Sequence, residues 1–352
     1  MEQLCHFVSS RGLLKSCSFH SLYPNSSCNN DTNYLNNMIN SNKMFDGMSI
    51  YVCSDLLKYF VLVILPKIKN KFTLVSGDSD VNVPIEILSK IEFNLLINHP
   101  LLMKWFAQNT RIQNEAKIIQ LPIGLDYHTI SNNPNHSWKT EGEGHLPRFQ
   151  EEILFNIRET MKPFYERNRL IYINFSKSND RFQQRKTAFE QIPNHLLSIN
   201  NDFTKRTQNW KNITQYTFVL SPFGMGMDCH RTWEALCLGA IPIVKAPNFQ
   251  KMFEDLPVLI VDEWTDITKE LLDKTIKEFT PLKIYNGTPQ AKQGVPLEIQ
   301  GQQLPINELN GTPPKAACLI SNLHRCKTKT ETKIFNYDKL NLSYWVNLIK
   351  NI

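Results

Sequence analysis

One stretch in the second half of the chain limits its fold more than any other. Residues 216–244 run YTFVLSPFGMGMDCHRTWEALCLGAIPIV. An apolar segment ends at a Ser-Pro pair, a glycine-rich turn follows, and an amphipathic helix leads to a second apolar segment. A strand that is followed by a turn, a helix and another buried strand is the repeating unit of a parallel sheet. The stretch therefore predicts an α/β fold.

Similar units recur along both halves of the 352 residues. In the first half the pattern predicts a crossover helix at 54–69 and strands at 4–9, 49–53, 72–76, 93–97 and 117–121. In the second half it predicts helices at 149–162, 228–238 and 265–279, and strands at 170–175, 216–220, 241–245 and 258–261. Single cores rarely grow beyond about 250 residues. We therefore expect two Rossmann-like domains that face each other across a cleft, where a ligand would bind.

Polar stretches indicate where these domains begin and end. Residues 131–147 are rich in Asn, His and Gly, and predict a linker between a first domain at 1–130 and a second at 148–281. Residues 282–333 lose all periodicity and predict an insertion, either a lid or a disordered segment. An amphipathic pattern resumes in 334–352 and predicts a terminal helix.

The glycine-rich turn and the helix after it predict an anion site. Bare amides at Gly224 and Gly226, together with the positive end of the helix dipole, favour a negatively charged group. Asp228 is a candidate N-cap for the helix. At 100° per residue, one stripe of the helix is apolar and predicts its core face, comprising Cys229, Trp233, Leu236 and Cys237.

The other face of this helix is polar and follows the turn directly. It carries His230, Arg231 and Glu234. Arg231 can neutralise a diphosphate with a planar fork of donors, and Glu234, one turn further on, can accept both hydroxyls of a ribose. The alternative is a solvated face with an Arg–Glu pair at i, i+3. The glycine turn in front of the helix favours the binding interpretation.

The same stretch resembles the C-terminal signature of the exostosin-like glycosyltransferases. Its pattern is Ser-Pro-x-Gly-x-Gly-x-Asp-x-His-Arg-x-Trp-Glu-Ala-Leu-x-x-Gly-x-Ile-Pro-Ile-Val, over residues 221–244. The resemblance is nearest to the ribitol-phosphate xylosyltransferase branch and related microbial and viral proteins. Weaker similarity extends to WFAQN at 105–109, LPIGLDYHT at 121–129 and NYDKL at 336–340.

This resemblance implies a GT-B fold, a nucleotide-sugar donor (a UDP-sugar first), no metal or other cofactor, and inversion at the transferred carbon. In such folds the donor lies on the second domain. The loop after the first strand of that domain often supplies a further cation, and Arg181 and Arg185 are available there. For Arg185 we favour a surface position. The expected donor-binding set is Arg181, Ser221, Gly224, Gly226, Asp228, His230, Arg231 and Glu234.

Glycosyl transfer also needs a base that takes the proton of the acceptor hydroxyl. Carboxylates that follow first-domain strands are placed for this role. Asp80 follows the strand at 72–76, and Asp126 follows the strand at 117–121. Either can instead form a turn or cap a helix. We name Asp126 and Asp80 as catalytic candidates, with Asp126 first because Pro122 restricts its loop.

Charge and hydropathy restrict the partners and the location. The net charge of +6 is modest and spread along the chain, so no nucleic-acid partner is expected. The longest apolar run, at 59–66, is far shorter than the ~20 residues that cross a bilayer. No signal peptide is recognisable at the start of the sequence, and we expect a cytoplasmic protein without a transmembrane segment.

Together these observations predict a metal-independent glycosyltransferase, a hexosyl- or pentosyltransferase. It would move a sugar from a nucleotide donor to a hydroxyl of a glycan or polyol-phosphate acceptor. Two alternatives remain open. One is a catalytically inactive sugar- or nucleotide-binding protein on the same fold, and the other is a sugar phosphorylase.

Overall fold

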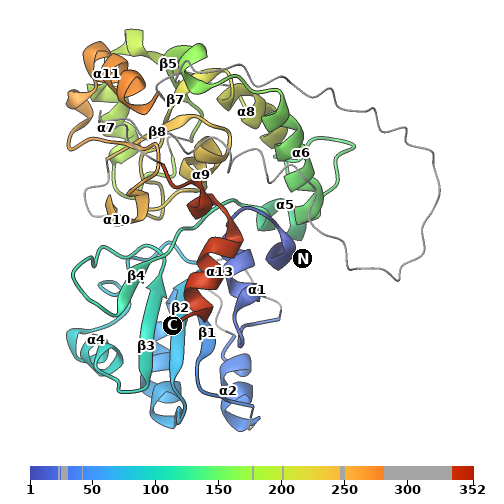
Figure 1. The fold of residues 1–352 in the computed structure, drawn as a ribbon, viewed down its shortest axis with the longest axis vertical. Helices are drawn as coiled ribbons and strands as arrows, with labels where there is room; N and C mark the ends of the chain where they lie inside the picture. The colour runs from blue at the N-terminus through green and yellow to red at the C-terminus, as the bar shows by residue number, and fades with distance from the viewer. Residues whose placement is uncertain are drawn as a thin grey trace, which may run out of the picture.

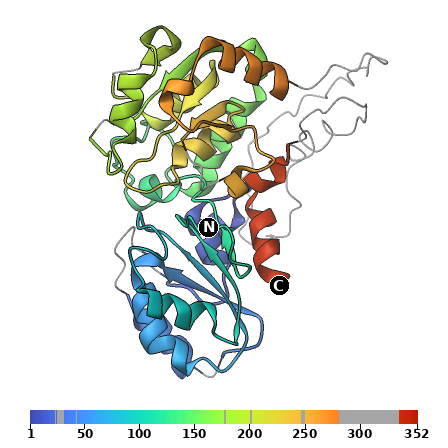
Figure 2. The same ribbon diagram turned by 90° about the vertical axis from the view of Figure 1, so that its left-hand side faces the viewer.

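The fold is a mixed α/β arrangement with two parallel sheets (Figures 1 and 2). The structure is a computed structural model that describes residues 1–22, 24, 31–41, 43–176, 178–199, 202–245, 250–280 and 335–352. The predicted insertion at 282–333 lies outside these residues. The residues on its two sides are in contact, since the ring centres of Phe279 and Phe335 are 5.0 Å apart. No helix within the described ranges is long and apolar enough to cross a membrane.

The first half forms a four-stranded sheet in the order β1-β2-β3-β4. Its strands are β1 (Met48–Cys53), β2 (Phe72–Gly77), β3 (Leu102–Ala107) and β4 (Ile118–Gln120). Side chains alternate between the two faces of each strand. One face packs on α2 (Asn33–Asn40), on a helical stretch that contains α3 (Leu57–Tyr59), and on α4 (Lys90–Ile97). The other face packs on α1 (Ser10–Ser16) and α13 (Leu342–Lys350).

The second half forms a five-stranded sheet in the order β6-β5-β7-β8-β9. The strands are β5 (Asn168–Ile173), β6 (Leu197–Ile199), β7 (Tyr216–Leu220), β8 (Ile241–Val244) and β9 (Leu259–Ile260). From β5 the chain adds β6 on one side and then β7 on the other. The strand order therefore reverses between β5 and β7, and parallel sheets bind ligands beyond the carboxyl ends of such strands.

Helices cover both faces of this second sheet. α7 (Gln184–Gln191) and α11 (Lys269–Phe279) lie on one face. The other face carries α6 (Pro147–Glu159), α8 (Arg206–Ile213), α9 (His230–Cys237) and α10 (Gln250–Phe253). A short helix, α5 (His128–Asn132), follows the first sheet. The hydrophobic cluster on the α6, α8 and α9 face continues into the α1 and α13 face of the first sheet.

The C-terminal segment returns to the N-terminal residues. The backbone N–H of Val8 donates to Leu340, and that of Leu342 donates to His6, each at 2.8 Å. Helix α13 then packs against α1, as both views show (Figures 1 and 2). α13 falls within 334–352, the segment for which the sequence predicts a terminal helix, and it lies against the first sheet.

Two predicted strands are wrong. In residues 4–9, Leu4 ends a 3-10 helix and the rest form isolated bridges at Phe7 and Ser9, after which α1 begins at Ser10. Residues 93–97 belong to α4, where Ser89 and Glu92 form a capping box that starts the helix. On the side away from β1, β2 pairs with β3, a strand that the sequence pattern did not predict. In the second half α7, β6 and α8 were not predicted either.

Candidate functional site

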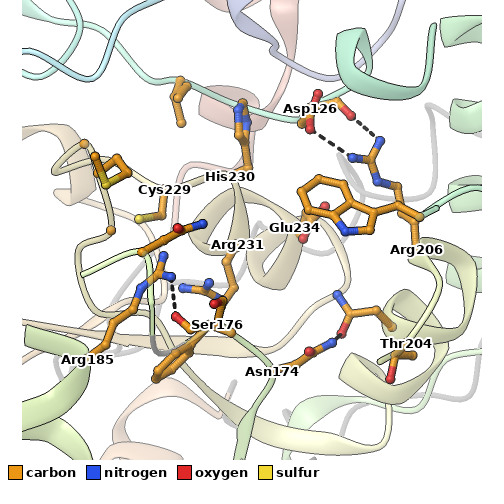
Figure 3. A pocket seen from close by; sticks show the side chains of 18 of the residues that line it. Asp126, Asn174, Ser176, Arg185, Thr204, Arg206, Cys229, His230, Arg231 and Glu234 are labelled. Carbon is orange, nitrogen blue, oxygen red and sulfur yellow. Dashed lines mark hydrogen bonds and ion pairs between the residues drawn. The ribbon is translucent and has the colours of Figure 1, made fainter. Parts of the chain in front are cut away.

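A cavity of about 570 Å³ lies at the carboxyl ends of β5 and β7 (Figure 3). Asn174, Phe175 and Ser176, directly after β5, line one wall, and the glycine turn after β7 lines another. Loops that follow first-sheet strands contribute Asp80 and Asp126. The cavity thus lies at the reversal of strand order, and both sheets supply its walls.

The glycine turn is closed by its own backbone and by neighbouring side chains. The N–H of Gly224 donates to the carbonyl of Gly226 at 3.1 Å. A Cβ atom on Gly224 would collide with the guanidinium of Arg185, and one on Gly226 would lie 3.0 Å from Oδ1 of Asp80. Glycine at both positions therefore lets Arg185 and Asp80 approach the turn.

Two arginines lie beside this turn, and both are close to the ring of one phenylalanine. Cζ of Arg231 is 4.8 Å from the ring centre of Phe175, and Cζ of Arg185 is 5.4 Å from it. Arg185 is buried and donates to the carbonyls of Ser176 and Phe223. The surface position that we favoured for Arg185 is therefore wrong.

Arg231 carries an unsatisfied donor. Its Nη1 atom is buried and has no hydrogen-bond partner among the described residues. Burial lowers the pKa of Arg231 to about 10, so the side chain is still charged at neutral pH. A buried charge without a partner is costly, and an anion in the cavity would provide the missing acceptors. Glu234, half-buried one turn further along α9, lines the same cavity.

Asp228 lines the cavity, but its carboxylate is fully engaged by protein groups. It accepts from the indole N–H of Trp233 at 2.9 and 3.0 Å and from the backbone N–H of Ile123 at 2.7 Å. Burial raises its pKa to about 6. The N-cap of α9 is Cys229, so the capping role expected for Asp228 is wrong. Asp228 instead joins the turn to the loop after β4.

Asn109 makes a second bridge between the two halves. Its Oδ1 accepts from the backbone N–H of Asp228, and its Nδ2 donates to the carbonyl of Ser79, each at 2.9 Å. Asn109 is buried and has a φ of 52°, a left-handed conformation that Asn tolerates better than most residues. The side chain thus joins the loop that carries Asp80 to the glycine turn.

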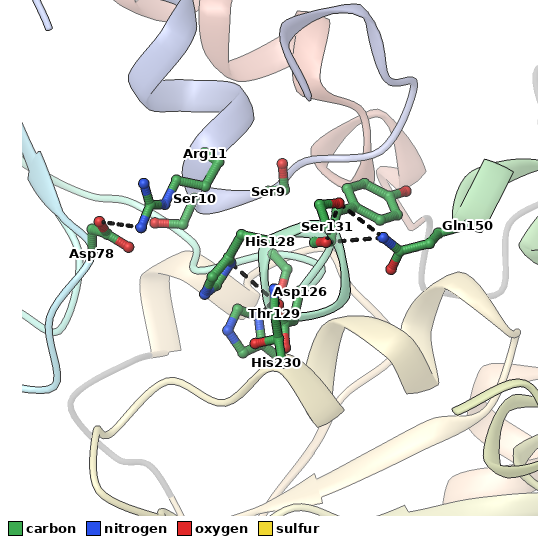
Figure 4. A network of polar contacts seen from close by, with 12 residues as sticks. Ser9, Ser10, Arg11, Asp78, Asp126, His128, Thr129, Ser131, Gln150 and His230 are labelled. Carbon is green, nitrogen blue, oxygen red and sulfur yellow. Dashed lines mark hydrogen bonds and ion pairs between the residues drawn. The ribbon is translucent and has the colours of Figure 1, made fainter. Parts of the chain in front are cut away.

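His230 is oriented by a backbone carbonyl. Its Nδ1 lies 2.7 Å from the carbonyl oxygen of Gly124. Because a carbonyl only accepts, Nδ1 must carry the proton, and in the neutral ring Nε2 is an acceptor. His230 lines the cavity, and its ring centre is 5.9 Å from that of His128 (Figure 4).

The two candidate bases lie in different environments. Oδ2 of Asp126 pairs with Nη2 of Arg206 at 2.9 Å, and Oδ1 accepts from the backbone N–H of Thr129 at 2.9 Å (Figures 3 and 4). Burial opposes ionisation of Asp126, but Arg206 and the nearby histidines hold its pKa well below the usual range. Asp80 has no partner for its carboxylate among the described residues, and burial raises its pKa. Asp80 is therefore the better proton acceptor.

Two predicted donor-binding residues do not line the cavity. Arg181 pairs with Glu86 at 2.7 Å, and the hydroxyl of Ser221 lies 2.8 Å from that of Thr232. Arg206, which the sequence did not single out, lines the cavity from α8. Within the described ranges no group of three His, Cys, Asp or Glu side chains is arranged to hold a metal ion.

Comparisons with known proteins add little to this geometry. No protein-family model and no curated protein matches the chain. Among solved structures, a chain described as an alpha1,3-fucosyltransferase is similar at 12% identity and a TM-score of 0.32. The match covers 65% of this chain and 65% of that one, so this chain spans slightly less than two thirds of its length. A likeness this weak carries no argument about the fold or the activity.

Proposed function

We propose that this chain is a glycosyltransferase of the GT-B type that binds a nucleotide sugar at the start of α9. The observation that carries the proposal is the buried Nη1 of Arg231, which has no hydrogen-bond partner in the described part of the chain and lies beside a glycine turn in a cavity with walls from both sheets. A donor diphosphate would accept from Arg231 and from turn amides other than that of Gly224, whose N–H already donates to the carbonyl of Gly226. Arg185 adds positive charge behind the turn.

The remaining cavity residues fit the rest of such a donor. Glu234 would accept the ribose hydroxyls, and Nε2 of His230 would accept from a hydroxyl of the transferred sugar. Asp80 would take the acceptor proton as the acceptor oxygen bonds to the anomeric carbon and the bond to the diphosphate breaks. One displacement of this kind inverts the anomeric carbon. The charge that develops on the departing diphosphate is met by Arg231.

The proposed domains follow from the two sheets. Residues 1–130 form the acceptor-side domain and 148–281 the donor domain, with 131–147 between them and 334–352 returning to the first. We propose a glycan or polyol-phosphate hydroxyl as the acceptor and a UDP-sugar as the first donor to test. The sequence signature at 221–244 supports this choice.

Binding and turnover of nucleotide sugars test the proposal. Wild-type protein should be stabilised against heat by one donor, by about 2.7 kcal/mol at 100 times its dissociation constant. Arg231→Ala should weaken binding and slow turnover together, because its contact strengthens as the diphosphate departs. Glu234→Gln should mainly raise the donor concentration that is required.

A surface arginine supplies the control. Arg148 is exposed on α6 and, among the residues that the structure describes, pairs with Glu152 alone, so Arg148→Ala should change neither binding nor turnover. The proposal is wrong if no nucleotide sugar binds, or if Arg231→Ala behaves like Arg148→Ala. Donor binding without transfer or hydrolysis would indicate the binding-protein alternative.

A further inference from the structure

The end of the cavity away from the glycine turn has a different character. In Figure 3, Thr204 and Arg206 lie on the opposite side of Glu234 from Arg185. Trp138 and Phe203 also line the cavity, and both are exposed, at 41% and 66%. Arg206 links this end to Trp138, because its Cζ is 5.4 Å from a ring of that side chain. Aromatic side chains thus line the part of the cavity beyond Glu234.

Trp138 is held in place although it is exposed. The backbone carbonyl of Trp138 accepts from the backbone N–H of Arg206 at 2.8 Å, and the backbone N–H of Trp138 donates to Nδ1 of His136 at 3.2 Å. The ring of His136 packs edge-on against it at 4.9 Å. Arg206 is in turn fixed by Asp126. A rigid, partly exposed indole offers a stacking surface without the entropy cost of ordering a mobile side chain.

Two asparagines add a paired hydrogen-bonding edge to the cavity. Nδ2 of Asn174 donates to Oδ1 of Asn209, which also accepts from the hydroxyl of Tyr172 at 3.1 Å. Oδ1 of Asn174 and Nδ2 of Asn209 then have no partner among the described residues. If both amides were flipped, the outward-facing donor and acceptor would only exchange places. In either case the pair offers one donor and one acceptor.

We propose that Trp138 is the stacking platform for the nucleobase of the donor, and that Asn174 and Asn209 bind the base edge. The inference rests on the proposed function, which sets the direction of the ligand. The transferred sugar must lie near Asp80, which touches the glycine turn, so the nucleoside must extend past Glu234 toward Trp138. A base edge presents donors and acceptors side by side, as the asparagine pair requires.

Fluorescence gives a direct test. All six tryptophans fall in the described ranges, and Trp138 alone among them is exposed. A nucleotide that stacks on it should quench the solvent-exposed part of the emission. The probes are UDP, GDP, CDP and ADP, with inorganic pyrophosphate as the ligand that lacks a base. Trp138→Phe should abolish this quenching while keeping most of the affinity, because a phenyl ring still stacks.

Affinities separate this inference from the proposed function. Trp138→Ala should weaken the tightest nucleoside diphosphate about 10- to 100-fold, since base–aromatic stacking contributes about 1–3 kcal/mol. Pyrophosphate binding should stay unchanged. Asn209→Ala should weaken the same nucleotide and alter the preference among the four bases. Arg231→Ala should weaken pyrophosphate and nucleotides alike.

Each contrary result has one meaning. If Arg231→Ala loses nucleotide binding while Trp138→Ala keeps it, the platform is refuted and the proposed function stands. The platform is also refuted if Trp138→Ala changes only the KM for an acceptor, because the ring would then contact the acceptor sugar. If wild-type protein binds neither pyrophosphate nor any of the nucleotides, both proposals fail.

Discussion

The bridge made by Asn109 allows a quantitative prediction for the contact between the two halves. In Asn109→Gly the backbone N–H of Asp228 and the carbonyl of Ser79 both lose their side-chain partner. Leaving a buried polar group unsatisfied costs about 1–3 kcal/mol. With two such groups, we expect the free energy of unfolding to fall by about 2–6 kcal/mol.

Asn109→Ala is the matched variant. It removes the same two hydrogen bonds, but it also places a Cβ atom at a φ of 52°. An L-residue in the left-handed region costs roughly 1–2 kcal/mol, which glycine avoids. We therefore expect the free energy of unfolding to decrease from Asn109 (wild type) to the Gly variant and then to the Ala variant. The difference between the Gly and Ala variants should be about 1 kcal/mol, because the greater conformational freedom of glycine in the unfolded chain offsets part of the strain that glycine avoids.

Urea unfolding at pH 7, followed by circular dichroism, measures both steps. The affinity for the tightest nucleotide should fall in both variants, because the glycine turn loses its tie to the first half. A loss below about 1 kcal/mol for Asn109→Gly would show that the bridge is replaced by water or by relaxation of the loops. Equal stability of the Gly and Ala variants would refute the argument from backbone strain.

Three further outcomes are expected. Trp233→Ala should cost about 3–5 kcal/mol in urea unfolding through a core cavity, whereas Trp233→Phe, which loses only the indole donor and part of the ring, should cost less. Burial lowers the pKa of His128 to about 4, so between about pH 6.5 and pH 4 His128 is protonated in the unfolded chain but neutral in the folded chain. The contribution of His128 to the free energy of unfolding should therefore be highest above pH 6.5 and decline toward pH 4. His128→Gln should make this decline shallower, and an identical pH dependence of the free energy of unfolding in the variant would contradict the prediction. Asp80→Asn should lower turnover about 10²- to 10⁴-fold at an unchanged melting temperature, whereas Asp126→Asn should mainly lower the melting temperature by weakening the pair with Arg206. The reverse pattern would exchange the two roles.

Local chemistry explains what the sequence predicted well. β7 begins and ends as expected, α9 and β8 lie within a residue or two of their predicted bounds, and Trp233 is fully buried. In this region the hydrophobic period, the turn glycines and the core stripe all predict the same structure. The run at 93–97 was ambiguous, because five apolar-rich residues fit a strand or a buried helix equally well. The capping box of Ser89 was the available signal.

The environments of the side chains that line the cavity depend on contacts between residues far apart in the sequence, which no local sequence pattern encodes. Arg185 is buried because the glycine turn has no Cβ to exclude it. Asp126 is a tightly paired carboxylate because α8 brings Arg206 beside it from 80 residues away. The sequence placed Asp80 and Asp126 correctly after first-sheet strands, but their different environments arise only when the two halves meet.

Because α13 packs on α1, the fold of the first half can be completed only after α13 has been synthesised. Ribosomes release residues 335–352 after every other described segment, yet α13 covers the apolar face that α1 shares with the first sheet. A nascent chain therefore carries that face uncovered until α13 has left the ribosome. Premature termination before Phe335 would leave it exposed for good, and such truncated products should be held by chaperones or aggregate. A bulky domain inserted directly after Ile352 should be tolerated far better than removal of α13.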